Sequence, residues 1–367
     1  MAGAGQLSAA MSGEEARRLS ALLLRWFERH RRDLPWRRTS DPYRIWISEV
    51  MLQQTQVDRV IGYYDSFIEA FPTVQSLAAA TPGDVLRRWE GLGYYSRAHN
   101  LHAAARLIVE RHAGQFPRSV EDARALPGVG EYTAGAVLSI AFGLLLPALD
   151  ANAIRVLARL FAIRGDLSKG QPRRRIEALA SDAVPTDRPG DFNQALMELG
   201  ALICIAGQPG CLLCPLTEIC AARREGAQAE IPPPKVRPIR QVSAVAGVVR
   251  DGGGVLVVRK PAGGQWGGLW EFPGAPLLPS RDREQTLIEY LWRAVGIEAR
   301  VVSPLAQFAY GVMNQRVELT TLLAERVGGT VRLTEHDEAR WVHPDDLPDL
   351  AMPSPHRSIA EQLVSRR

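Results

Sequence analysis

Three consecutive prolines, Pro232, Pro233 and Pro234, divide this chain of 367 residues into two parts with different sequence patterns. Proline fixes φ and lacks an N–H group, so this segment cannot continue a helix and favours an extended connection. Before it, apolar residues recur at helical spacing over 45–54, 57–70, 101–111, 132–142 and 154–163. After it, 242–250 and 254–259 predict a β-hairpin, 286–295 a helix, and 316–325 and 339–343 further strands. We therefore predict a mainly α-helical region over 14–225, a proline-rich linker over 226–240 and a smaller α+β domain over 241–365.

Composition indicates an ordinary soluble protein, because 46% of residues are hydrophobic and 23% are charged. The net charge of +4 permits a phosphate-bearing partner without requiring one. The N-terminal apolar stretch 19–26 follows charged residues and has the pattern of an amphipathic helix, not of a signal peptide. The longest apolar run, 135–149, is too short to span a membrane and contains Pro147. We expect a soluble intracellular protein without a membrane partner.

All four cysteines lie within one short segment, with the spacing Cys204-x6-Cys211-x2-Cys214-x5-Cys220. Cysteines grouped in this way indicate a metal or cluster site in a reducing compartment rather than disulfides. Four thiolates can hold a zinc ion or a four-iron cluster, and ligand chemistry alone leaves both open.

Residues 126–135 form a glycine-rich turn that opens a helix. Glycines let a backbone approach a ligand closely, and the N–H groups at a helix start favour an anion. The expected ligand is a DNA phosphate, bound through the backbone of Gly128, Val129 and Gly130. A single Pro-Gly-x-Gly sequence is, by itself, usually only a turn.

Two carboxylates stand in positions suited to chemistry. Asp150 precedes helical residues, where it would serve as a helix N-cap, and the backbone donors there would keep it ionised. Glu49 lies in a helix that is apolar around much of its circumference. Burial would raise its pKa and keep a proton available, although the pattern alone favours an exposed glutamate.

Taken together, these motifs resemble the adenine DNA glycosylases of the MutY type, within the helix–hairpin–helix (endonuclease III) superfamily. The resemblance rests on Leu34-Pro35-Trp36-Arg37, on residues 48–56, on the hairpin, on the Asp150 segment and on the six-two-five cysteine spacing. It implies a six-helix barrel over 31–140 and an iron–sulfur domain built from 14–30 and 141–225. The four cysteines would hold a [4Fe-4S] cluster that orders a DNA-contacting loop.

The resemblance also implies roles for individual residues. Glu49 would protonate the adenine ring, and Asp150 would stabilise an oxocarbenium-like sugar. Tyr132 stands where bifunctional members carry a lysine nucleophile, so we expect base removal without efficient strand scission. Further roles fall to residues near the sugar (Tyr132, Asn152), in the adenine pocket (Arg32, Leu34, Trp36, Arg37, Gln194) and at the base stack (Gln54, Tyr94).

Residues 265–274 resemble the opening of a Nudix fold, and MutY proteins carry such a domain to recognise 8-oxoguanine. A Nudix hydrolase needs a glutamate-rich helix, but the corresponding positions fall near Tyr290, Arg293 and Ala294, so we expect recognition rather than hydrolysis. The family's recognition loop usually has a histidine, for which Asn314, after Met313, is the nearest equivalent.

The expected partner is double-stranded DNA with adenine opposite 8-oxoguanine or guanine, bound by a monomer in the cytoplasm of a bacterial cell, at the nucleoid. Three alternatives remain. Tyr132, Glu49 and the extra domain argue against an endonuclease III-like glycosylase and lyase for oxidised pyrimidines. A non-enzymatic iron–sulfur DNA-binding protein would need Glu49 and Asp150 to be idle, and the missing glutamates disfavour a Nudix hydrolase.

Overall fold

A computed structural model describes residues 11–233 and 238–365. Its contacts divide the chain into two compact units, Met1–Ala78 with Ala103–Lys235, and Ala79–His102 with Val236–Arg367. Pro234 of the predicted linker lies outside the described residues. Among those that are described, no helix is both long and apolar enough to pass through a membrane.

The first part of the chain is helical, as predicted, and no strand occurs in residues 11–233. Its first helix shows why: Ser12 and Glu15 form a capping box, and Leu19, Leu23 and Phe27 bury one face. The elements are α1 (Gly13–His30), η1 (Pro35–Arg37), α2 (Pro42–Leu52), α3 (Val57–Ala70), α4 (Val74–Ala79), α5 (Pro82–Trp89), α6 (Ser96–Arg111), α7 (Val120–Ala125), α8 (Glu131–Phe142), α9 (Ala151–Leu160), α10 (Gly170–Ala183), α11 (Pro189–Leu202), η2 (Cys211–Leu213), η3 (Thr217–Ile219) and α12 (Ala221–Arg224).

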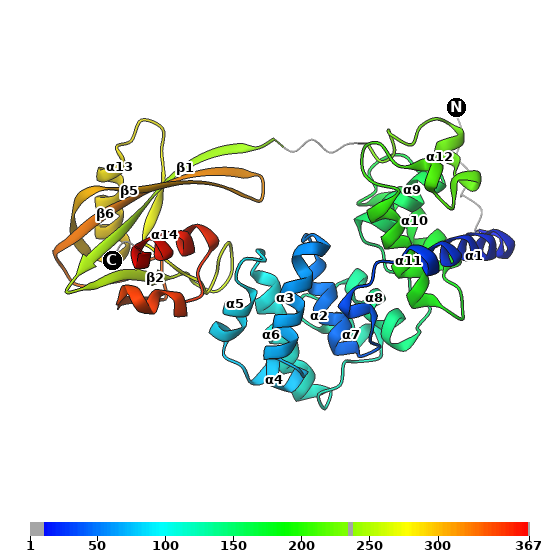
Figure 1. The fold of residues 1–367 in the computed structure, drawn as a ribbon, viewed down its shortest axis with the longest axis horizontal. Coiled ribbons are helices and arrows are strands. Elements are labelled where there is room, and N and C mark those ends of the chain that lie inside the picture. Colours follow the sequence, from blue (N-terminus) through cyan, green and yellow to red (C-terminus); the bar gives the residue numbers. More distant parts are fainter. Residues whose placement is uncertain (1–10, 234–237, 366–367) are drawn as a thin grey trace. The chain divides into compact units, whose positions relative to one another are not determined.

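Helix α11 is central to the first unit, because it packs against α1, α8 and α9, while α2 packs against α8 (Figure 1). Phe192, Leu196 and Leu199 of α11 are buried in the same apolar core as the inner face of α1. Ala227 and Ile231 also belong to that core, so the described beginning of the predicted linker is part of the helical unit.

The C-terminal region is α+β, as predicted, and is built on a mixed sheet with the order β3-β2-β1-β6-β5. The predicted hairpin is confirmed, because β1 and β2 pair antiparallel, whereas β1 and β6 run parallel. The elements are β1 (Arg240–Asp251), β2 (Gly254–Arg259), β3 (Trp270–Glu271), β4 (Gly274–Leu277), α13 (Arg283–Tyr290), a π-helical turn η4 (Leu291–Val295), β5 (Ile297–Val312), β6 (Gln315–Gly329), β7 (Glu338–Val342), η5 (Pro344–Asp349) and α14 (Ser354–Ser365).

Residues 79–102, which include α5, belong to the second unit. Arg357 of α14 forms a half-buried ion pair with Glu90, in which Nη2 donates to Oε2 at 2.8 Å. His99 Nε2 lies 2.8 Å from the carbonyl oxygen of Gly267. The subdivision of the helical region into 31–140 and 14–30 plus 141–225 stays a prediction.

Candidate active site

A cavity of about 830 Å³ lies in the first unit, and residues of η1, α2, α8 and α11 line it. This volume suits a small ligand such as a nucleobase with its sugar. The cavity brings together most of the site residues expected from the sequence: Arg32, Leu34, Trp36, Arg37, Glu49, Gln54, Gly128, Gly130, Tyr132, Asp150, Asn152 and Gln194.

Glu49 is buried in the wall of this cavity, with 5% of its surface exposed. Helix α2 is covered on nearly all sides, since Ile45, Trp46 and Ile47 are also buried, and the alternative of an exposed glutamate is therefore wrong. Burial raises the pKa of Glu49 to about 7, against the lowering effect of a hydrogen bond that the Tyr132 hydroxyl donates to Oε2. The carboxyl group can thus hold a proton near neutral pH.

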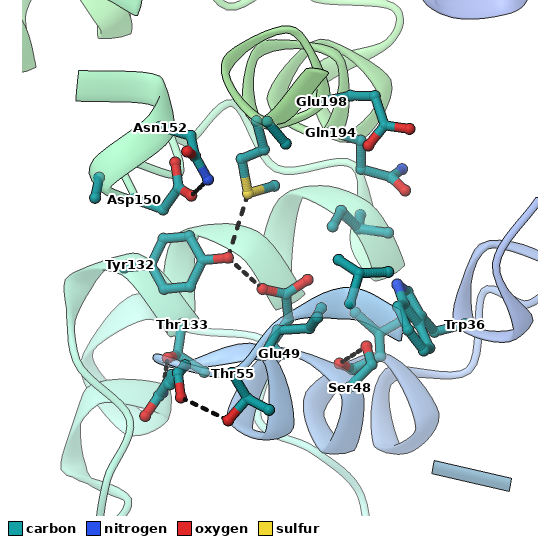
Figure 2. A pocket seen from close by; sticks show the side chains of 18 of the residues that line it. Trp36, Ser48, Glu49, Thr55, Tyr132, Thr133, Asp150, Asn152, Gln194 and Glu198 are labelled. Atoms are coloured by element: carbon teal, nitrogen blue, oxygen red, sulfur yellow. Dashed lines mark hydrogen bonds between the residues drawn. The ribbon is translucent and has the colours of Figure 1, made fainter. Parts of the chain in front are cut away.

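Tyr132, in the first turn of α8, places its hydroxyl between Glu49 and the sulfur of Met197, which is 3.2 Å away. Figure 2 shows its ring between Asp150 and Glu49. Burial, with the nearby carboxylates, raises the pKa of Tyr132 well above its ordinary value of 10. The phenol therefore stays protonated and acts as a hydrogen-bond donor to Glu49.

Asp150 is the N-cap of α9, as predicted: Oδ1 accepts from the N–H of Ala153 at 2.6 Å, and Oδ2 accepts from Asn152 Nδ2 at 2.8 Å. Burial nevertheless raises the pKa of Asp150, and these hydrogen bonds offset it only in part. The cap donors favour the ionised form, as expected, but burial opposes them, and the proposed role of Asp150 stays a prediction. Helix α11 approaches closely here, because a Cβ added to Gly200 would lie 2.6 Å from the Cβ of Asn152.

Glu198 of α11, which sequence reasoning missed, joins Arg32 and Arg37 at the same cavity. Its side chain is 1% exposed, and each guanidinium donates to both of its oxygens. Burial alone would raise its pKa, but the bonds from the two arginines lower the pKa of Glu198 to about 2. A glutamate inside the apolar helix 189–202 was the available signal.

Comparison with known proteins decides the family. Residues 47–182 match the HhH-GPD superfamily of base excision DNA repair proteins, and residues 244–362 match the NUDIX domain. The adenine DNA glycosylase of Homo sapiens is 34% identical over 394 residues, covering 92% of this chain and 72% of the human protein. The chain belongs to the adenine DNA glycosylase family.

Two further proteins show how much of the chain is similar to known glycosylases. The rat (Rattus norvegicus) adenine DNA glycosylase is 38% identical over 328 residues, which cover 74% of this chain and 64% of the rat protein. A thermostable thymine-DNA glycosylase has a similar structure, with a TM-score of 0.53 and 30% identity over 58% of this chain and 98% of that one. The helical fold of this chain is therefore shared with a DNA glycosylase that is named for thymine rather than for adenine.

The hairpin of this glycosylase joins α7 to α8. Gly128 has a φ of +75°, a conformation that favours glycine, and Gly130 is the N-cap of α8, with no side-chain cap. The side chain of Val129 is buried, and its N–H donates to the carbonyl of Leu126 at 3.1 Å, which stabilises the turn. Phosphate contact through the backbone of residues 128–130 stays a prediction.

Gln54, Tyr94 and Met313 all have a positive φ, of +58°, +48° and +53°. Such a conformation is uncommon for residues other than glycine and persists where the surroundings impose it. All three side chains are exposed. Gln54 belongs to the first unit, and Tyr94 and Met313 belong to the second.

The four cysteines lie along the segment that contains η2 and η3. Burial, followed by weaker effects of the other three cysteines, raises the pKa of Cys214 to about 11. Cys204 Sγ accepts from Arg159 Nη1 at 3.4 Å. Within the described part of the chain, no three Cys, His, Asp or Glu side chains gather into a group that could hold a metal ion. The four thiols as placed are therefore not arranged as the ligands of one metal ion.

In the C-terminal domain, Met313 and Asn314 lie between β5 and β6, beside a hollow of about 420 Å³ that Ile239 and Tyr310 also line. Met313 is 80% exposed.

At the positions where a Nudix hydrolase carries glutamates, Tyr290 and Ala294 are buried, and Arg293 pairs with Glu335. None of these three positions therefore carries a carboxylate that could bind magnesium as in a Nudix hydrolase.

Proposed function

We propose that the protein removes adenine opposite 8-oxoguanine or guanine by hydrolysing the bond between the base and its sugar. The observation that carries the proposal is the buried Glu49, with a pKa of about 7, in one cavity with Asp150. Such a pair provides one acid and one anion, the arrangement that glycoside hydrolysis needs.

In this mechanism the adenine is rotated out of the duplex into the cavity. Glu49 donates its proton to N7 of the ring, so that the C1′–N9 bond breaks and its electron pair stays with the base. Asp150 faces the positive charge that develops on the sugar. A water molecule then adds to C1′ and gives its proton to the ionised Glu49, which leaves free adenine, an abasic site and the acid in its starting state.

A single-turnover assay tests these roles, on a duplex with adenine opposite 8-oxoguanine that is treated with alkali afterwards. We expect Glu49→Gln and Asp150→Asn to abolish release while duplex binding stays close to that of the wild type. Glu69→Gln, an exposed change on α3, serves as a control with the wild-type rate. A normal rate in either active-site variant would refute the assignment.

The pH dependence follows from the direction of the Glu49 shift. The proton on Glu49 must be present, so the rate should fall about tenfold per pH unit above pH 7. It should be level just below pH 7 and fall again only at the lower pH where Asp150 becomes protonated. A rate that rises through pH 7 would contradict a protonated Glu49.

Tyr132 leads us to propose a monofunctional enzyme. A phenol cannot form the Schiff base that a lysine forms with the sugar. Borohydride should therefore trap no covalent complex with DNA, and strands should break only after alkali. Efficient trapping would instead favour the endonuclease III-like alternative.

We further propose that Met313 and Asn314 contact the base opposite adenine. Their exposure at the end of a long hairpin supports this, and an amide can both donate to and accept from a base edge. Asn314→Ala should narrow the difference in rate between duplexes with 8-oxoguanine and with guanine, whereas Glu284→Gln, a change at an exposed residue of α13, should not. Equal rates for both duplexes in the wild type would remove the specificity claim.

A [4Fe-4S] cluster held by Cys204, Cys211, Cys214 and Cys220 is the remaining proposal. The family and the cysteine spacing support it, although the thiols as placed would have to draw closer together. Iron and sulfide analysis of the purified protein, with zinc measured beside it, distinguishes the cluster from the zinc alternative.

A further inference from the structure

Glu198 holds two positive side chains that reach the cavity from a different part of the chain. Arg32 donates from Nε to Oε1 at 3.0 Å and from Nη2 to Oε2 at 2.7 Å. Arg37 donates from Nη1 to Oε1 and from Nη2 to Oε2, both at 3.0 Å. The backbone N–H of Arg32 adds a bond to Oε1 at 2.9 Å. A carboxylate with this many donors has no lone pair to spare for a substrate.

The two arginines, which line the cavity, keep unused hydrogen-bond donors. A guanidinium has five N–H donors, and the bonds above take two of them on Arg32. On Arg37 they take two, and Nη1 also donates to the carbonyl of Arg32 at 3.1 Å. Each guanidinium therefore retains donors suited to the ring nitrogens of a purine, which are acceptors. Glu198 fixes the direction in which those donors point.

The titratable and charged groups around Glu49 come from four sides of the cavity. Arg37 belongs to η1, Tyr132 to α8, Asp150 precedes α9, and Glu198 belongs to α11. Arg37 favours ionised Glu49, and Asp150 favours the protonated form. The carboxylate of Glu198 lies on Arg37 and cancels much of its field. Without it, the guanidinium of Arg37 would act on Glu49 uncompensated, with that of Arg32 beside it.

We propose that Glu198 is a positioning residue of the excision reaction, which aims Arg32 and Arg37 at the purine and shields Glu49 from their charge. This inference rests on the proposed function. Glu198 does not touch the reacting atoms, and its effect passes through the two arginines and through the proton on Glu49.

The test is the pH profile of single-turnover adenine release in Glu198→Gln, which keeps the shape of the side chain and removes its charge. We expect the alkaline limb of the profile to move to lower pH and the rate just above pH 7 to fall about tenfold or more. Glu198→Asp, which retains the charge, should keep the limb near its wild-type position. Glu28 lies on α1 and pairs with Arg188 at the surface, so Glu28→Gln removes a carboxylate there and should leave the pH profile unchanged.

A double variant separates charge from structure. Adding Arg32→Gln to Glu198→Gln removes one positive charge as well, so the limb should return toward its wild-type position, while affinity for a duplex with a non-cleavable fluorinated deoxyadenosine falls. Thermal unfolding of each variant identifies those that fail to fold, and Glu198→Asp then carries the comparison. A limb that stays in place in Glu198→Gln, or a loss of rate that is uniform with pH, would overturn the inference. Absence of adenine release by the wild type would instead overturn the proposed function.

Discussion

Replacing Glu49 by glutamine should stabilise the fold at neutral pH while it removes the proposed proton donor. Glu49 is 5% exposed, and burial raises its pKa from an ordinary 4.5 to about 7. This rise corresponds to about 3 kcal/mol, the cost of keeping the ionised carboxylate in the cavity wall rather than in water. Glutamine has a similar shape, and its amide oxygen can still accept the hydrogen bond from Tyr132.

The direction in which stability changes with pH follows from proton binding by Glu49 in the folded and the unfolded protein. Between pH 4.5 and about 7 the folded protein retains the Glu49 proton, whereas the unfolded chain has lost it. The contribution of Glu49 to the free energy of unfolding therefore falls as pH rises through this window, and stays low above it. Glutamine has no proton to lose, so the stability of the variant relative to the wild type should increase by about 3 kcal/mol from the lower to the upper end of the window.

Urea denaturation at a series of pH values, followed by the helical circular dichroism signal, measures this difference. Subtracting the wild-type curve from the variant curve largely cancels the other titrating groups. Glu69→Gln, which changes an exposed glutamate on α3, should give a difference that is flat with pH. Parallel curves for the wild type and Glu49→Gln would refute both the raised pKa and the proton-donor role built on it.

Two further predictions concern packing and ion pairing. Gly200→Ala would place a Cβ 2.6 Å from the Cβ of Asn152, so it should lower the free energy of unfolding in urea by about 1–3 kcal/mol and slow adenine release. The control Gly62→Ala, in open space on α3, should be neutral or slightly stabilising. Arg357→Met leaves the half-buried Glu90 without its charged partner and should lower the stability of the second unit by about 3 kcal/mol, seen as a lower midpoint for the strand signal. Unchanged midpoints would contradict the close helix approach in the first case and the ion pair in the second.

The helical half of the fold was predictable because its periodicity is strong and its caps are local. The predicted helix over 57–70 coincides with α3. Strand β5, in contrast, was not predicted as a strand. It spans 16 residues, but its register shifts near Ala299, Ser303 and Ala306, and Pro304 interrupts its donors. These irregularities break the alternation by which a strand is found in a sequence.

The candidate site also contains features that the sequence predicts and features that it does not. The residues of the recognised motifs could be named in advance because each motif is local in the sequence, and the fold then gathers them in one cavity. Glu198 escaped because its partners, Arg32 and Arg37, lie 166 and 161 positions away and only tertiary packing brings them together. The raised pKa of Asp150 escaped for a related reason: its cap bonds are local, whereas the burial that outweighs them comes from the whole fold.

Glu49 and Glu198 illustrate how one cavity can hold identical side chains in opposite protonation states. Both are buried, so desolvation acts to raise the pKa of each. Glu49 receives one hydrogen bond, from a neutral phenol, and its pKa stays near 7. Glu198 receives bonds from two guanidiniums, which overcome the same burial and hold its pKa near 2. The charge of the donors thus decides which glutamate can give up a proton at neutral pH, and a change that moved one guanidinium from Glu198 to Glu49 would remove the acid without altering any residue at the reacting atoms.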